Sequence, residues 1–497
     1  MKTGAKRMAK GLLAALMLAV TCGATAQDLE PLKMPTVNED AVMQHIVELS
    51  SERYAGRLAG TEGYNAAVDY VEKVLKGYGL TMMSQPFEIE CNEVENCKFN
   101  TYLPGTKEKR VYTLGNEFCC AGMTGRGYVD AQMVFCGYGL SSGMIDDYEK
   151  VDVQGKIVVV LSGLPEGGWL SKEDADRSIL LRDKARIAEK HGALGMLVVN
   201  TSNSCPSYEP QSRIYCGEMP HLSTFPILHL TLDCGRELLQ DEAMALDSAM
   251  SRINWLHAPC SFALTKRTEI DVNARYTPRA KTCNLMALLP GSDKRMQEEL
   301  VVVAASLDHA GMQGETCLFP GADINASGVA ALLETARLLS SKGYRPRRSI
   351  LFVLFSGSET QYMGSRIFVT GYKNMGRIEA CINLQNIGSG EGVALLGGAR
   401  HPELWDLAKK QDDFNLVDMQ WKESTVRGDA RAFDAMGVPS LVFTAHKGMR
   451  HNHVTSDIWE NIDRRLLVMT TQMAVGTVRE VSDGYYQGRK LKSRSRR

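Results

Sequence analysis

Five segments in the C-terminal half of the chain carry side chains able to bind a metal ion or move a proton. In chain order they are 306-SLDH-309, 321-GADINASG-328, 358-SE-359, Gln385 and 450-RHNHVTSD-457. Asp323, Glu359 and His453 offer two carboxylates and one imidazole, which zinc accepts in catalytic sites that keep a position open for water or substrate. The three residues have no fixed local spacing, so spacing alone leaves open that they cap helices or face solvent.

The segments follow apolar stretches that are typical of buried strands. These stretches are 284–291, 299–308, 348–355, 379–388 and 438–445, and helical spacing appears at 327–343 and 463–481. Apolar strands that alternate with helices predict an α/β fold, with a mostly parallel sheet covered by helices on both faces. Because ligands bind beyond the carboxyl ends of the strands in such sheets, we expect the five segments to meet there.

Residues 115–265 have a pattern of strands and helices of their own and are predicted to form an inserted domain. A strand at 155–163, an amphipathic helix at 178–192 and a strand at 193–202 make a β-α-β unit. Residues 27–114, with helical spacing at 38–52 and 64–79, and residues 266–482 would then form the other domain. At 497 residues the chain is long enough for two cores.

The amino terminus has the pattern of a cleavable signal peptide over residues 1–26. Four basic residues precede an apolar run at 11–20, and Ala24 and Ala26 have A-x-A spacing. Lipoprotein processing at Cys22 is the alternative. We therefore expect an exported protein, periplasmic or extracellular, without a transmembrane segment. Loss of these residues leaves a net charge of about −5, which gives no reason to expect binding to nucleic acid.

Residues 483–497 end in a run of like charges, 489-RKLKSRSRR-497, and are predicted to be a disordered basic tail. Thirteen cysteines are present, of which Cys22 lies in the signal peptide. Cys91 with Cys97, or Cys205 with Cys216, are close enough in sequence to form disulfides in an exported chain. We interpret the cysteines as structural, since no C-x-x-C metal spacing occurs.

Several motifs, in order, resemble the M28 family of zinc aminopeptidases with an inserted protease-associated domain. They are 56-GRLAGTEGYNAAVDYVEKVLKGYGL-80, 148-YEKVDVQGKIVVV-160, 299-ELVVVAASLDHAG-311, 321-GADINASGVAALLETARLL-339 and 351-LFVLFSGSETQYMGS-365. The resemblance covers most of the chain beyond the signal peptide. It implies a zinc-exopeptidase fold. It also implies an enzyme that acts on the amino termini of peptides.

The resemblance also implies roles for individual residues. The family site usually holds two zinc ions bridged by an aspartate, which Asp323 matches, while Glu359 and His453 match two further ligands. Ser306 stands where the family has a histidine, and Gln385 stands where it has an aspartate. Both missing side chains serve the same ion, so a single zinc is expected.

Ser358 occupies the position of the family's general base, a glutamate that takes a proton from the attacking water. A hydroxyl cannot do this near neutral pH, and loss of a general base typically costs about 10²–10⁴-fold in rate. Asp308 is the first candidate for a relocated base, because the family uses this aspartate to orient the histidine that is missing here. His309, Glu315 and Asp429 are further candidates, and each is otherwise a hydrogen-bonded loop residue.

Three functions remain open from the sequence. The first is an exported exopeptidase of the aminopeptidase type with one zinc ion and an altered base. The second is a catalytically inactive pseudopeptidase that binds peptides or protein amino termini. The third is acyl transfer like that of the glutaminyl cyclases, which the single-zinc site also resembles, although those enzymes keep the acidic base that Ser358 replaces.

Overall fold

The computed structural model describes residues 36–103, 105–142, 145–168, 170, 181–201, 209, 212, 220–413, 425–448 and 453–486. The predicted signal peptide and Cys205, Cys216 and residues 487–497 lie outside the described residues. The start of the predicted tail is packed, because Tyr486 is buried and its carbonyl accepts a hydrogen bond from the Arg348 guanidinium.

The half of the fold that contains residues 284–482 is built on parallel strands. In spatial order these are β15 (Ser440–His446), β13 (Ile378–Leu384), β9 (Leu300–Ser306) and β12 (Ser349–Phe355), with β14 (Gly392–Leu396) antiparallel at the edge. Every residue of β9, β12 and β13 is buried. The predicted mostly parallel sheet is therefore confirmed.

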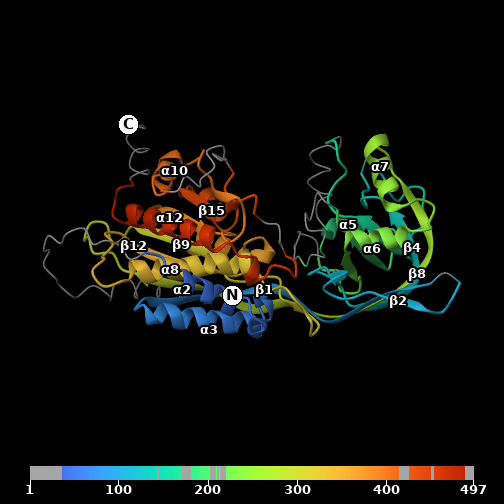
Figure 1. Cartoon of the computed structure of the whole chain (residues 1–497), viewed down its shortest axis with the longest axis horizontal. Helices are drawn as coiled ribbons and strands as arrows, with labels where there is room; N and C mark the ends of the chain where they lie inside the picture. Colours follow the sequence, from blue (N-terminus) through green and yellow to red (C-terminus); the bar gives the residue numbers. More distant parts are fainter. Residues whose placement is uncertain are drawn as a thin grey trace. The chain divides into compact units, whose positions relative to one another are not determined.

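Helices cover this sheet (Figure 1). They are α2 (Glu39–Leu49), α3 (Glu62–Gly77), α8 (Gly328–Leu339), α9 (Met363–Gly371), α10 (Pro402–Lys409), α11 (Ala430–Ala435) and α12 (Arg464–Ser482). Phe368 of α9 and Phe433 of α11 pack against Val302 and Val353 on one face of the sheet. Helices α8 and α12 contact each other and the strands β9 and β13. The predicted helices at 38–52, 64–79, 327–343 and 463–481 are all present.

Two long antiparallel strands connect this half to the insert, and the sequence analysis predicted only the part of them at 284–291. Strands β1 (Thr81–Tyr102) and β8 (Ser261–Leu289) pair from Thr81 and Leu288 to Thr101 and Thr268. One end of β8 pairs with β12 and the other with β4. The ribbon therefore belongs to both halves of one continuous sheet.

The insert contains the predicted β-α-β unit. Its elements are β2 (Lys109–Val111), β3 (Phe118–Cys120), β4 (Gly127–Cys136), β5 (Ile157–Leu161), α5 (Leu181–Lys190), β6 (Gly195–Val199), β7 (Ile227–Leu230), α6 (Leu232–Leu239) and α7 (Leu246–Leu256). The core of the insert also includes Val94, Phe99, Tyr112 and Ala274. The core of the insert thus extends beyond the predicted boundaries at 115 and 265, because the long strands β1 and β8 contribute residues to it.

Cys91 and Cys97 are free and lie in different cores. Cys91 packs with Leu58 and Ile89, whereas Cys97 packs in the insert. Six residues of extended strand span roughly 20 Å, and a disulfide needs Cα atoms within about 7 Å. The suggested bond between these two cysteines is therefore wrong.

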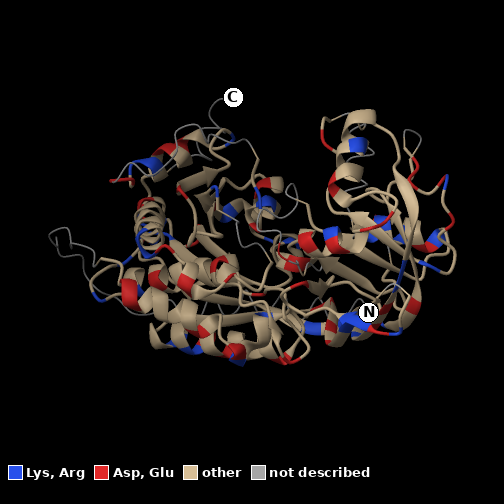
Figure 2. Cartoon of the chain, turned by 45° about the vertical axis from the view of Figure 1, so that its right-hand side comes forward, with Lys and Arg blue, Asp and Glu red and all other residues tan. Residues whose placement is uncertain are grey.

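Lys and Arg side chains are interspersed with Asp and Glu over the helices and strands seen in Figure 2. This distribution matches the formal net charge of −1 for the whole chain. None of the helices in the described ranges combines the length and apolar character needed to cross a membrane.

Candidate metal site

Three side chains converge beyond the carboxyl ends of the parallel strands. His309 follows β9, Glu359 lies in the 3-10 turn after β12, and His453 follows β15. One ligand atom from each lies within 4.8 Å of those of the other two. Nε2 of His453 is 2.5 Å from Oε1 of Glu359, and the rings of His309 and His453 have centroids 5.3 Å apart. The group offers two nitrogens and one oxygen.

The ring of His309 is buried, and the described residues offer it no hydrogen-bonding partner. Its residue is 1% exposed, and neither ring nitrogen has a partner within the described part of the chain. Burial lowers the pKa of His309 well below its ordinary value, which keeps the imidazole neutral. A β-carbon at Gly321, where φ is +63°, would lie 2.5 Å from Cδ2 of His309, so the glycine leaves room for the ring. Two imidazoles and a carboxylate fit zinc.

Asp323, a predicted ligand, is not a member of this group. Its Oδ1 accepts a hydrogen bond from the backbone of Gly388 at 2.7 Å, and its Oδ2 accepts one from the Ser389 hydroxyl at 2.6 Å. The structure therefore brings together two of the three predicted ligands, Glu359 and His453. It adds His309, which the sequence analysis had considered only as a base.

Ser306 and Gln385 both form hydrogen bonds inside the fold. The Ser306 hydroxyl donates to Oδ2 of Asp429 at 2.6 Å, and the Gln385 amide donates to the Tyr362 hydroxyl at 3.2 Å. Burial raises the pKa of Asp429 to about 6, against hydrogen bonds from Ser306 and Ser365 that lower it. A hydroxyl and an amide are poor substitutes for the histidine and carboxylate that zinc prefers.

Asp308 contacts the backbone of Ser358. The amide of Ser358 donates to both carboxylate oxygens, at 3.1 and 2.9 Å. Burial raises the pKa of Asp308 to about 7, the Ser358 amide lowers it, and the charge of Glu359 raises it further. Glu315, another base candidate, is exposed and lies outside the group.

Arg57 forms hydrogen bonds that hold the segments of His309 and Asp323 in place. It is 1% exposed, and its guanidinium donates to the carbonyls of Leu49, Leu307 at 3.1 Å, Pro320 at 2.9 Å and Gly321 at 2.9 Å. Its own carbonyl accepts a hydrogen bond from the His309 amide at 3.0 Å. The sequence indicated only a glycine-punctuated motif here, because the partners of Arg57 are far away in the chain.

Replacing Arg57 with alanine is expected to lower the free energy of unfolding by about 3 kcal/mol, because buried carbonyls lose a charged donor. Urea unfolding followed by circular dichroism measures this change. Arg53→Ala is the control, since that side chain is 70% exposed and pairs with Glu48, and its effect should stay within about 0.5 kcal/mol. Equal effects of the two changes would contradict the assigned role of Arg57.

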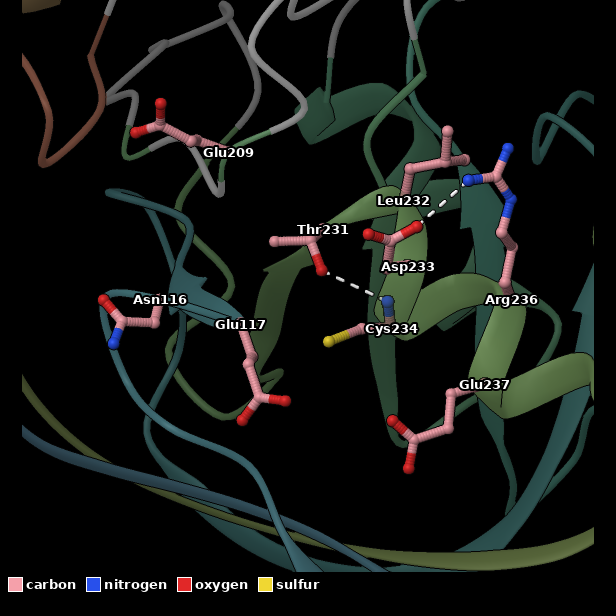
Figure 3. A pocket seen from close by; sticks show the side chains of 9 residues that line it. All are labelled: Asn116, Glu117, Glu209, Thr231, Leu232, Asp233, Cys234, Arg236 and Glu237. Atoms are coloured by element: carbon pink, nitrogen blue, oxygen red, sulfur yellow. Dashed lines mark hydrogen bonds and ion pairs between the residues drawn. The ribbon is translucent and has the colours of Figure 1, made fainter.

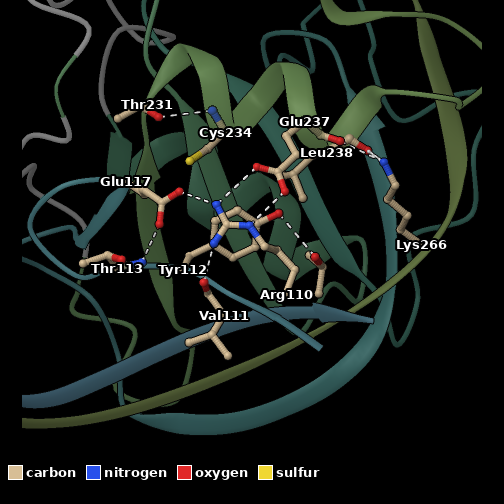
Figure 4. Close-up of polar contacts among 11 residues, drawn as sticks. Arg110, Val111, Tyr112, Thr113, Glu117, Thr231, Cys234, Glu237, Leu238 and Lys266 are labelled. Atoms are coloured by element: carbon tan, nitrogen blue, oxygen red, sulfur yellow. Dashed lines mark hydrogen bonds and ion pairs between the residues drawn. The ribbon is translucent and has the colours of Figure 1, made fainter. Parts of the chain in front are cut away.

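A separate cavity of about 620 Å³ lies in the insert, around the start of α6 (Figure 3). Arg110 bridges two of its acidic residues, Glu117 and Glu237 (Figure 4). Another lining residue, Glu209, accepts a hydrogen bond from Ser456 at 2.7 Å. The cavity thus borders the loop that carries His453, but none of its lining residues belongs to the group of His309, Glu359 and His453.

Two segments of the chain match models of known protein families. Residues 284–478 match the family model of peptidase family M28, and residues 127–238 match the model of the PA domain. Glu359 and His453 lie inside the segment that matches peptidase family M28, and the segment that matches the PA domain lies inside the insert.

Individual proteins are also similar to this chain. An aminopeptidase of Pseudomonas aeruginosa is 24% identical over 357 residues, which cover 70% of this chain and 56% of that protein, so the chain spans little more than half of its relative. Transferrin receptor protein 2 of Mus musculus is 27% identical over 210 residues, which cover 37% of this chain and 25% of the receptor. The solved zinc aminopeptidase of Bacillus subtilis has the same fold, with a TM-score of 0.65 at 17% identity over 92% of this chain and 98% of that structure.

Proposed function

We propose that this chain is a zinc-dependent exopeptidase that removes residues from the amino termini of peptides. The observation that carries the proposal is the contact between Glu359 and His453, with the unpartnered imidazole of His309 beside it. This group lies beyond the carboxyl ends of parallel strands, where ligands bind in sheets of this type. The match of residues 284–478 to peptidase family M28 and the aminopeptidase relative support the choice of reaction.

We propose one zinc ion per chain, held by the group that contains Glu359 and His453. Bound there, zinc would polarise the scissile carbonyl and lower the pKa of a water molecule. Ser306 and Gln385 argue against a second ion, because both already form hydrogen bonds within the protein. The pattern over residues 1–26 supports export of the enzyme to the periplasm or beyond the cell.

The first test is removal of the metal from the purified mature chain. Treatment with 1,10-phenanthroline is expected to lower the hydrolysis of aminoacyl 4-nitroanilides by at least about 100-fold, since a Lewis acid contributes several kcal/mol to the transition state. Zinc should restore the rate. The N-acetylated substrates serve as controls and should not be cleaved, because an aminopeptidase acts on a free amino terminus. Hydrolysis that is insensitive to the chelator would refute a zinc enzyme.

We propose Asp308 as the altered general base, because its buried carboxylate contacts the position of Ser358. Asp308→Asn keeps an oxygen to accept the Ser358 amide but removes the basic carboxylate. We expect kcat to fall about 100-fold or more, while the zinc content measured by elemental analysis stays the same. An unchanged kcat would assign the base elsewhere.

A peptide-binding pseudopeptidase is the second candidate, and Ser358 is the residue that favours it. The relative named as a transferrin receptor is compatible with a binding role on this fold. Under this alternative, peptides with a free amino terminus bind in isothermal titration calorimetry, but the aminoacyl 4-nitroanilides are not hydrolysed even with zinc present.

A further inference from the structure

We infer that His309, and not Asp323, is the third protein ligand of the metal in this chain. The inference rests on the proposed zinc site, but it concerns a residue that the family pattern does not use. The imidazole expected at position 306 is absent, and an imidazole is present three residues later, beyond the same strand end.

The distances allow one ion to contact all three side chains. Zinc binds nitrogen and oxygen ligands at about 2.1 Å, so tetrahedral ligands lie roughly 3.4 Å apart. The ligand atoms of His309, Glu359 and His453 are within 4.8 Å of one another. The contact of 2.5 Å between Glu359 and His453 must open by about 1 Å to admit the ion. The distances from His309 to the other two ligand atoms are at most 4.8 Å, so they need to close by no more than about 1.4 Å.

The hydrogen bonding of His309 and Asp323 also favours His309 as the ligand. His309 is 1% exposed, and neither of its ring nitrogens has a partner among the described residues. A buried polar group of this kind calls for a ligand, because burial without a partner is unfavourable. Both oxygens of Asp323, by contrast, accept short hydrogen bonds from Gly388 and Ser389. Asp323 therefore connects segments of the fold by hydrogen bonds, and binding a metal ion would disturb them.

The backbone around His309 holds its ring towards the group. Its amide donates to the carbonyl of Arg57, and the space occupied by the ring depends on the missing β-carbon of Gly321. With two imidazoles and one carboxylate, the site should prefer zinc or cobalt to magnesium or calcium, which favour oxygen ligands. Three protein ligands also leave one position open for water or substrate.

Zinc binding to full-length mature variants tests the inference without any measurement of activity. We expect isothermal titration calorimetry to detect one zinc ion bound by the wild-type chain and by Asp323→Asn, and at least about a 100-fold weaker affinity for His309→Gln, by analogy with the larger losses seen when metal sites lose a ligand or its support. Wild-type affinity in His309→Gln would overturn the inference and leave the zinc enzyme intact. A wild-type chain that binds no zinc would overturn both.

Cobalt spectroscopy of cysteine variants keeps the inference testable if His309→Gln folds poorly. A thiolate that coordinates Co²⁺ directly adds a charge-transfer band in the near ultraviolet. We expect His309→Cys loaded with Co²⁺ to gain this band relative to the wild-type chain, and Asp323→Cys not to gain it. The band in Asp323→Cys alone would assign the ligand to Asp323 and refute the role of His309.

Discussion

His453→Ala is expected to abolish zinc binding and to lower peptide turnover by about 10³-fold or more. His453 contacts Glu359 directly and lies within 4.8 Å of His309, so it belongs to every ligand set that this site allows. Its loss leaves one imidazole and one carboxylate, too few to hold zinc against exchange with water. Several kcal/mol of transition-state stabilisation then disappear, and each 1.4 kcal/mol corresponds to about tenfold in rate.

Elemental analysis after dialysis against zinc, together with hydrolysis of aminoacyl 4-nitroanilides, measures both effects. His446→Ala is the matched control, because His446 ends strand β15 in the same segment but is not a member of the group. It should keep the zinc and most of the turnover. Retention of both by His453→Ala would show that the metal ligands lie elsewhere.

The sequence predicted the central sheet well because its strands are buried on both faces. Strands such as β9 and β12 read as continuous apolar runs, a pattern that only a covered parallel sheet tolerates. Of the paired strands β1 and β8, only residues 284–291 were predicted, since exposed and buried positions alternate irregularly along the rest and Pro86 and Pro278 interrupt the pattern. Because most of these two strands was not predicted, the expected boundaries of the insert at 115 and 265 excluded residues of β1 and β8 that belong to its core.

Two of the three proposed ligands were predicted as ligands from the sequence, and the third was not. Glu359 lies in a motif that resembles the family, His453 matches the family's C-terminal histidine, and the structure brings the two into contact. The choice between Asp323 and His309 depends on where each side chain finds its partners. Gly388 and Ser389, which bond to Asp323, are more than sixty residues away in sequence. Only the fold reveals that Asp323 accepts hydrogen bonds, whereas the ring of His309 has no hydrogen-bonding partner among the described residues.

Ser358→Glu is expected to raise kcat for aminoacyl 4-nitroanilides by about 10²-fold or more, because it returns a carboxylate to the position of the lost general base. The site can accommodate the longer side chain, since Ser358 is partly exposed and its backbone is already fixed by the carboxylate of Asp308. Glu359, the adjacent ligand, stays in place. Steady-state kinetics at saturating zinc measures the change.

Ser358→Gln separates proton transfer from packing. Glutamine has nearly the same size and polarity as glutamate but cannot accept the proton, so it should leave kcat at the level of the wild-type chain. A gain with glutamate alone means that Ser358 is what limits an otherwise competent site, in which Asp308 serves as a weaker base. No gain with either variant would contradict that view and favour a chain that binds peptide amino termini without cleaving them, since a complete zinc site would then lack more than its base.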